Sequence, residues 1–212
     1  MAKNVYLVRH GESESNVGLV SRGHTALLTP KGEIQAQMIA QRCAKLPVDL
    51  IVSSGYPRAD KTAAYIAEAV PRPLIQSDLF VERRQPSSTI GILHDDPRYE
   101  AYLDAFWDRF TDPTCRHEDA ENFDDLKLRA LQALQFLIDR PEKNILVVGH
   151  GLFSRILAAA ATYGEEMSAR ECLGLLYALY TENTGISLLK YIPDRGRPPW
   201  RIMLWNDDAH LG

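Results

Sequence analysis

Short apolar runs that alternate with segments of helical periodicity constrain the fold of this chain more than any other feature. Residues 4–8 (NVYLV), 49–52 (DLIV) and 144–149 (NILVVG) have the composition of buried strands. Residues 30–46 and 58–69 space their apolar side chains as helices do, and each begins beside a proline. Strands that alternate with helices form parallel sheets. The sequence therefore predicts an α/β fold, a three-layer sandwich whose central, mostly parallel sheet carries helices on both faces.

The remainder of the chain completes this pattern. Further helices are predicted at residues 99–110, 121–140 and 152–161, and further strands at residues 74–76, 186–192 and 200–205. The last two strands are expected at the edge of the sheet, with a turn at residues 195–199 between them.

One segment departs from the regular alternation. Residues 82–120 contain prolines, scattered charges and a turn-rich stretch around a single helix. We find no repeat, linker or low-complexity segment. We therefore expect one domain, residues 1–212, in which residues 82–120 form an insertion or lid over the site.

Composition argues against several classes of protein. With a net charge of −4, the chain is a poor non-specific binder of nucleic acid, which is held by Lys and Arg. Cys43, Cys115 and Cys172 are too scattered for a disulfide framework or a zinc ribbon. No apolar run reaches about 18 residues, and no signal peptide precedes the first strand, so we expect a cytoplasmic protein without membrane contact. The oligomeric state does not follow from the sequence.

Two histidines follow apolar strands directly, each beside glycine. The first strand leads into Arg9-His10-Gly11, and the strand at residues 144–149 leads into His150-Gly151. Ligands of open parallel sheets bind outside the carboxyl ends of the strands. Arg58 begins the helix after another strand, where free N–H groups favour an anion. The sequence thus predicts one site that contains both histidines and both arginines.

This set of side chains indicates phosphoryl chemistry. Arginine donates two parallel hydrogen bonds to phosphate, and Arg9 and Arg58 concentrate positive charge in an acidic chain. A histidine can attack phosphorus and form a phosphohistidine, which divides a difficult step into two easier ones. Glu82, beyond the strand-like run at residues 74–76, is the best placed proton donor for the leaving oxygen.

Four blocks of the sequence, in this order, resemble the histidine phosphatase superfamily, whose members are similar to phosphoglycerate mutase. They are LVRHGESESN at residues 7–16, SSGYPRADKTA at 53–63, FVERR at 80–84 and the Gly-His-Gly of residues 149–151. The resemblance extends over nearly the whole chain, including LTPKGEIQA and ENTGISLL.

The resemblance implies a role for each matching residue. His10 would be the nucleophile, and Arg9, Arg58 and His150 would hold the phosphoryl oxygens and stabilise charge in the transition state. Glu82 would protonate the leaving group and then accept a proton from water. Further substrate contacts are expected from the following residues: Asn16, Arg22 and Gly151. No metal and no other cofactor is implied, because the arginines neutralise the phosphate.

Three functions remain open on this scaffold. We favour a metal-independent phosphatase, a hydrolase of the histidine acid phosphatase type that acts on a small phosphorylated metabolite or another phosphate monoester. The alternatives are a phosphotransferase of the phosphoglycerate mutase type and a non-catalytic phosphate-binding protein. The stretch after Glu82 lacks the early Tyr and the later paired arginines of the mutases, and it is acidic at the following positions: Asp95, Asp96, Asp104 and Asp108.

Two smaller questions concern single residues. Arg22, Arg83 and Arg84 would be able to receive a second anionic group, although solvated loop charges explain them equally well. His10, His150 and Glu12 would be able to ligate zinc, but the neighbouring arginines would repel a cation. We expect a structural or orienting role for Glu12.

Overall fold

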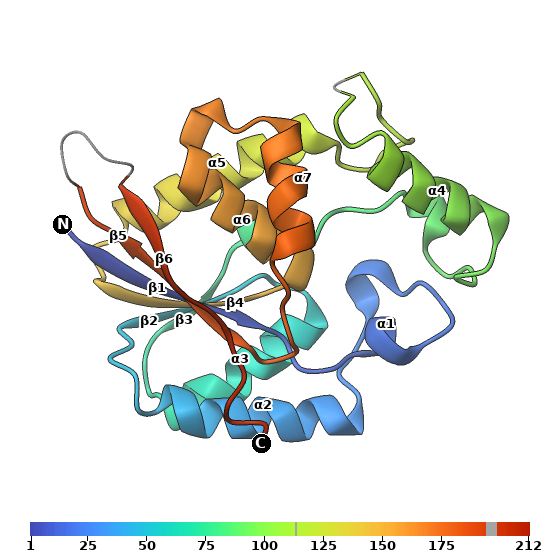
Figure 1. Ribbon diagram of the computed structural model, residues 1–212. Helices are drawn as coiled ribbons and strands as arrows, with labels where there is room; N and C mark the ends of the chain where they lie inside the picture. Colours follow the sequence, from blue (N-terminus) through green and yellow to red (C-terminus); the bar gives the residue numbers. More distant parts are fainter. Residues whose placement is uncertain (113, 194–198) are drawn as a thin grey trace.

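The computed structural model describes residues 1–112, 114–193 and 199–212, and within them the chain builds one sheet between two layers of helices (Figure 1). The strands lie in the order β3-β2-β4-β1-β5-β6. Their bounds are Lys3–Arg9 for β1, Leu50–Ser53 for β2, Leu74–Gln76 for β3, Asn144–Gly149 for β4, Ile186–Tyr191 for β5 and Trp200–Asp207 for β6. The predicted α/β fold is confirmed.

Pairing within the sheet is mixed. Strands β1, β4, β2 and β3 run parallel, whereas β5 is antiparallel to β1, and β6 is antiparallel to β5. The prediction that residues 186–192 form an edge strand is wrong. β5 lies inside the sheet because β6 pairs along its outer side, and Ile186 and Leu189 are accordingly buried. The turn predicted at residues 195–199 lies almost wholly outside the described residues.

Two layers of helices bury the two faces of the sheet. Helices α2 (Pro30–Cys43) and α3 (Pro57–Ala69) cover one face, and α5 (Phe123–Asp139), α6 (Gly151–Tyr163) and α7 (Ala169–Ala178) lie over the other (Figure 1). Successive residues of β4 belong to opposite cores: Val147 packs with Leu126 and Leu157, whereas Val148 packs with Ile39 and Ile66. This double burial explains why the strand reads as an uninterrupted apolar run.

Local signals place the ends of the helices. Thr29 caps α2 by accepting a hydrogen bond from the Gly32 amide at 3.1 Å, and Pro30 occupies the first turn. Asn122 and Asp125 form a capping box that starts α5. Helix α7 was not predicted, although Ser168 and Glu171 form the same kind of box. Within the described ranges, no helix is long and apolar enough to cross a membrane.

The predicted insertion, residues 82–120, lies beyond the carboxyl ends of the parallel strands. Its helix α4 (Pro97–Asp108) and the short helix α1 (Glu14–Val17) are on the same side of the molecule (Figure 1). The loop after α1 is hydrogen-bonded to the insertion: the Ser21 amide donates to the Ile92 carbonyl at 2.9 Å, and the Gly91 amide donates to the Ser21 carbonyl at 2.7 Å. The two segments therefore enclose the same region of the sheet edge.

Candidate active site

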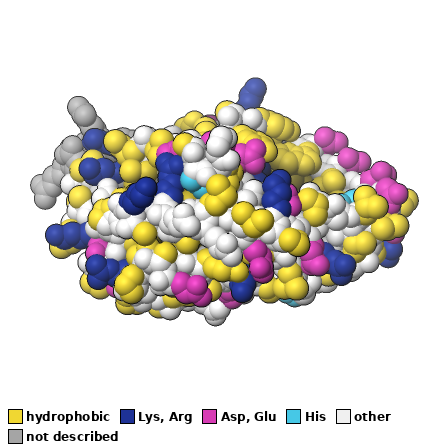
Figure 2. All heavy atoms as spheres, turned by 90° about the horizontal axis from the view of Figure 1, so that it is seen from below, with side chains coloured by type: hydrophobic (Ala, Val, Ile, Leu, Met, Phe, Trp, Pro, Cys, Tyr) yellow, Lys and Arg dark blue, Asp and Glu magenta, His cyan; other side chains and the backbone are white. Residues whose placement is uncertain are grey.

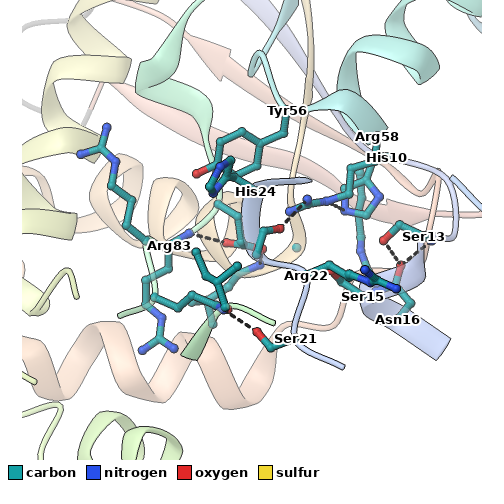
Figure 3. A pocket seen from close by; sticks show the side chains of 18 of the residues that line it. His10, Ser13, Ser15, Asn16, Ser21, Arg22, His24, Tyr56, Arg58 and Arg83 are labelled. Carbon is teal, nitrogen blue, oxygen red and sulfur yellow. Dashed lines mark hydrogen bonds between the residues drawn. The ribbon is translucent and has the colours of Figure 1, made fainter. Parts of the chain in front are cut away.

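A pocket of about 580 Å³ opens at the carboxyl edge of the parallel strands (Figure 3). It is rich in positive charge, since six arginines line it against two carboxylates. Such a pocket focuses a positive potential in an acidic protein and favours an anionic ligand. The charged lining residues are Arg9, Arg22, Arg58, Arg83, Arg84, Arg155, Glu82 and Asp119.

His10 is held in one orientation at the end of β1. Its Nδ1 lies 2.6 Å from the Gly11 carbonyl oxygen, and its Nε2 lies 3.0 Å from the Nε–H of Arg58. A carbonyl only accepts and a guanidinium only donates, so Nδ1 carries the proton and Nε2 carries the lone pair. The ring nitrogen beside Arg58, Nε2, therefore carries an electron pair, which accepts the Nε–H of Arg58.

The surroundings of His10 keep its ring neutral. Burial lowers the pKa of His10 well below its ordinary value of 6.5, and the charges of Arg58 and Arg9 lower it further. The ring is only 4% exposed. A neutral imidazole retains its nucleophilic lone pair at pH values at which a free histidine is protonated.

Close backbone packing fixes the loop that carries His10. A Cβ atom at Gly32 would lie 1.9 Å from the Glu12 carbonyl oxygen, and one at Gly11 would lie 2.4 Å from the Gly32 carbonyl oxygen. Only glycine allows the loop to approach the first turn of α2 this closely. The glycines therefore dock the segment after β1 onto α2 and so position His10.

Arg58 connects the two histidines. Nη2 donates to Nδ1 of His150 at 3.2 Å, and Nη1 donates to the Gly23 carbonyl at 3.0 Å. The side chain comes from the first turn of α3 and is 4% exposed. Figure 3 shows its guanidinium extending beside the His10 ring. Arg58 thus joins His10, His150 and the loop at Gly23.

His150 lies behind this arginine. Because Arg58 donates to Nδ1, the other ring nitrogen carries the proton, and Nε2 donates to Ser54 Oγ at 2.8 Å. The ring is 1% exposed and its centroid lies 5.1 Å from that of His10. Burial, followed by the charge of Arg58, lowers the pKa of His150 well below its ordinary value. The structure thus brings His150 against Arg58 and His10.

Arg9 and Gly151 lie against one another at the pocket. Arg9 donates through Nη1 to the Thr181 carbonyl at 2.7 Å, while its buried Nε has no partner among the described residues. A Cβ at Gly151 would lie 2.8 Å from Thr181 Oγ1 and 3.3 Å from Arg9 Nε. Glycine is needed here so that Arg9 can pass beside the first turn of α6.

Asn16 and Arg22 line the pocket and are exposed. Asn16 Oδ1 accepts from the Ser13 amide at 2.9 Å and from Asn183 Nδ2 at 3.3 Å, so the amide nitrogen of Asn16 remains a donor for a ligand. Figure 3 shows Arg22 beside Asn16 and His10. The structure therefore brings both residues to the predicted site.

The carboxylate of Glu82 lies at the N-terminus of helix α6. Its Oε2 accepts from the Leu152 amide at 3.2 Å, and its Oε1 accepts from the Phe153 amide at 3.0 Å and from the Arg83 amide at 2.9 Å. Backbone N–H groups at a helix N-terminus stabilise a carboxylate. The carboxyl group therefore reaches the pocket from a defined position beside Gly151.

Glu12 has a different environment from Glu82. Its Oε1 accepts from Thr29 Oγ1 at 2.8 Å, and its Oε2 pairs with Lys31 at 2.9 Å. These contacts lower the pKa of Glu12, with the Lys31 hydrogen bond as the largest cause. Glu12 connects the loop after β1 to α2, which agrees with an orienting role.

Some residues in or beside the pocket were not anticipated from the sequence. Asn183 donates to the His10 carbonyl at 2.9 Å, and the ring centroid of Tyr56 lies 5.1 Å from that of His150. Arg155 lines the pocket from α6, one turn after Gly151. The helical spacing of Gly151 and Arg155 would have indicated a shared face. No signal in the sequence connects Asn183 to His10, because their contact depends on β5 pairing with β1.

Metal-ligating side chains are dispersed in the described ranges 1–112, 114–193 and 199–212. Among these residues, no three His, Cys, Asp or Glu side chains come together as a metal site requires.

Comparison with known proteins identifies the family of this chain. The model of the histidine phosphatase superfamily (branch 1) matches residues 5–208. The chain belongs to this superfamily. A protein of Hydrogenobacter thermophilus described as a phosphoserine phosphatase is 31% identical over 70% of this chain and 73% of its own length. A protein of Shigella boydii described as a probable phosphoglycerate mutase, GpmB, is 32% identical over 79% of this chain and 81% of its own length.

Solved structures share the fold. YhfR of Bacillus stearothermophilus superposes with a TM-score of 0.82 at 26% identity, covering 99% of this chain and 100% of that protein. A phosphoserine phosphatase variant of Entamoeba histolytica, solved with phosphoserine, gives a TM-score of 0.77 at 24% identity, covering 99% and 100%. The second similarity concerns the fold alone.

Proposed function

We propose that the chain hydrolyses a phosphate monoester of a small metabolite through a phosphohistidine at His10. The observation that carries the proposal is the neutral imidazole whose Nε2 lone pair lies beside the Arg58 guanidinium in a pocket rich in cations. The name of the Hydrogenobacter thermophilus relative, a phosphoserine phosphatase, supports this class of substrate.

In the first step, Nε2 of His10 attacks phosphorus and the bond from phosphorus to the ester oxygen breaks. Protonated Glu82 gives its proton to the departing alkoxide, which leaves as the alcohol. Arg9, Arg58 and His150 stabilise the charge on the phosphoryl oxygens.

In the second step, a water molecule attacks the phosphorus of the phosphohistidine. Glu82, now a carboxylate, accepts the proton of this water, and the bond between phosphorus and His10 Nε2 breaks. Inorganic phosphate is released and His10 regains its lone pair. The cycle consumes one ester and one water and yields one alcohol and one phosphate.

A phosphotransferase of the mutase type is the second candidate, because relatives such as GpmB carry that name at 32% identity. A mutase must keep the phosphoryl group on His10 and exclude water. Tyr99 is the first tyrosine after Glu82, and it lines the pocket stacked on His94 at 4.7 Å. The sequence distance of Tyr99 from Glu82 therefore weighs less against a mutase than the sequence alone indicated.

The proposed hydrolysis requires no metal, because arginines supply the positive charge that metal ions supply to other phosphoryl-transfer enzymes. We expect the purified protein to hydrolyse p-nitrophenyl phosphate with unchanged kcat/KM after dialysis against EDTA. Loss of activity in EDTA and its recovery with magnesium or zinc would contradict the metal-free mechanism. Transfer of phosphate between the positions of a phosphoglycerate in preference to its hydrolysis would favour the mutase.

Vanadate should inhibit the reaction competitively. It becomes five-coordinate and resembles the phosphoryl transition state, which the site should bind more tightly than the substrate. Replacing Arg58 removes charge-assisted hydrogen bonds, so Arg58→Ala should weaken the binding of vanadate about 10- to 100-fold. Arg58→Lys serves as the matched control, because it keeps the charge but loses the planar fork. Inhibition that is non-competitive, or equally strong in Arg58→Ala, would place the oxyanion elsewhere.

A further inference from the structure

Arg83 is one of the six arginines that line the pocket, and it lies apart from the groups around His10. It follows Glu82 directly in the chain and lines the pocket. Figure 3 shows Arg83 on the opposite side of the pocket from His10 and Arg58. A phosphoryl group bound beside His10 and Arg58 therefore leaves Arg83 available to another part of the ligand.

The guanidinium of Arg83 lies over two rings of helix α4. Its Cζ is 3.4 Å from the centroid of Phe106 and 4.5 Å from that of Tyr102. A guanidinium stacked by its planar face leaves its N–H donors in the plane free to bind elsewhere. The two rings thus hold the guanidinium in place, and its N–H donors remain available to a ligand.

No acceptor in the described part of the chain takes these donors. Nη1 of Arg83 is buried without a hydrogen-bond partner, and no side-chain hydrogen bond of Arg83 is present among the described residues. Burial lowers the pKa of Arg83 to about 10, although the negative charge of Glu82 opposes this shift. A buried donor left unsatisfied destabilises the protein, and an incoming anion removes that cost.

The nearby carboxylates are already engaged. Glu121 accepts from Arg129 Nε and Nη2, both at 2.7 Å, and it also lies 3.8 Å from Arg84. Glu82 accepts from the amides of α6. Arg83 is therefore distinguished from Arg84, which has a carboxylate neighbour and is half exposed.

We propose that Arg83 binds a second anionic group, a carboxylate or a phosphate, on the alcohol part of the substrate. The inference rests on the proposed function, because Glu82 must lie beside the leaving oxygen in order to protonate it. Arg83, the next residue, then lies on the leaving-group side of the phosphoryl group. The substrate class becomes a phosphate monoester with an additional anionic group.

The test compares three esters that share a glycerol skeleton: 3-phosphoglycerate, glycerol 1,3-bisphosphate and glycerol 3-phosphate. Wild type should prefer one or both of the first two, and the preferred ester identifies the anion as carboxylate or phosphate. In Arg83→Met, the ratio of kcat/KM for that ester to kcat/KM for glycerol 3-phosphate should fall about 10- to 100-fold, the contribution of a charge-assisted hydrogen bond. Arg98→Met is the matched control, because Arg98 lies on α4, pairs with Asp96 at 2.7 Å and is 64% exposed.

A structural role for Arg83 gives a different result. If the guanidinium only holds α4 in place, kcat/KM falls equally for all three esters and the ratio is unchanged, which overturns the inference. Arg83→Gln provides a second measurement if the Met variant does not fold, and the same fall in the ratio is expected because Gln carries no charge. An unchanged ratio in folded Arg83→Gln also overturns the inference.

If the proposed function itself is wrong, the assays give a third result. In that case wild type hydrolyses none of the esters and no aryl phosphate. The anion site is then tested by calorimetry with 3-phosphonopropionate and with propane-1,3-diphosphonate, each against propylphosphonate. Tighter binding of either compound with a second anionic group to wild type, lost in Arg83→Met, would support the inference, and equal binding of all three compounds would overturn it.

Discussion

His10→Ala should lower kcat/KM for every phosphate ester by about 10⁴-fold or more, the scale expected when a covalent nucleophile is removed. Among the described residues that line the pocket, His10 is the one whose neutral ring carries a lone pair beside Arg58, at Nε2. His150 is not expected to substitute, because it is 1% exposed, lies behind Arg58 and is not among the residues that line the pocket. The loss should be independent of the leaving group, since no phosphohistidine forms with any ester.

The matched control is His117→Ala. His117 lies in the insertion, 6.1 Å from the Tyr102 ring, and does not line the pocket. It should retain wild-type kinetics. Activity in His10→Ala within about tenfold of wild type would mean that another group attacks phosphorus, since removal of a nucleophile costs far more.

Glu82→Gln should separate proton donation from phosphoryl binding. General acid catalysis contributes about 10² to 10⁴ in rate, so hydrolysis of an alkyl phosphate should slow by a factor in this range. An alkoxide is a strong base and needs a proton as the P–O bond breaks, whereas nitrophenolate leaves readily without one. The loss on p-nitrophenyl phosphate should therefore be much smaller.

The glutamine variant suits this test because it keeps the size and shape of the Glu82 side chain and removes its acidic proton. The amide oxygen of Gln can accept from the Phe153 and Arg83 amides, which now bind Oε1, whereas the amide nitrogen cannot accept from the Leu152 amide, which now binds Oε2. The measurement is kcat/KM for an alkyl and an aryl ester in wild type and variant. Equal losses on both esters would remove Glu82 from the role of acid, and Glu12→Gln would be the next variant to examine.

The sheet and its strand-end residues were predictable because local patterns and simple topology determine them. Residues 144–149 are apolar throughout since both faces of β4 are buried, and the parallel pairing of β4 with β1 brings His150 to the same edge as His10. Arg58 meets both because β2 pairs with β4 on the other side. The alternation of strands and helices predicts a parallel sheet whose strand ends share one edge, whereas the strand order that makes these side chains neighbours comes from the structure.

Contacts that depend on long-range packing were not predictable. β5 was expected at an edge because nothing in its own residues shows that β6 pairs outside it. Asn183 reaches the His10 carbonyl only because β5 pairs antiparallel with β1. The stacking of Arg83 on Tyr102 and Phe106 likewise depends on how α4 folds back, and the sequence shows only scattered charge and aromatic residues there.

Trapping the phosphorylated protein tests the central claim most directly. Wild type is mixed with a ³²P-labelled ester and quenched within milliseconds, and the label on the protein is measured after acid and after base. The mechanism predicts label on wild type that is labile in acid and stable in base, as a phosphohistidine is, and no such label on His10→Ala. Label that persists on His10→Ala, or turnover by wild type without any labelled protein, would contradict covalent catalysis by His10.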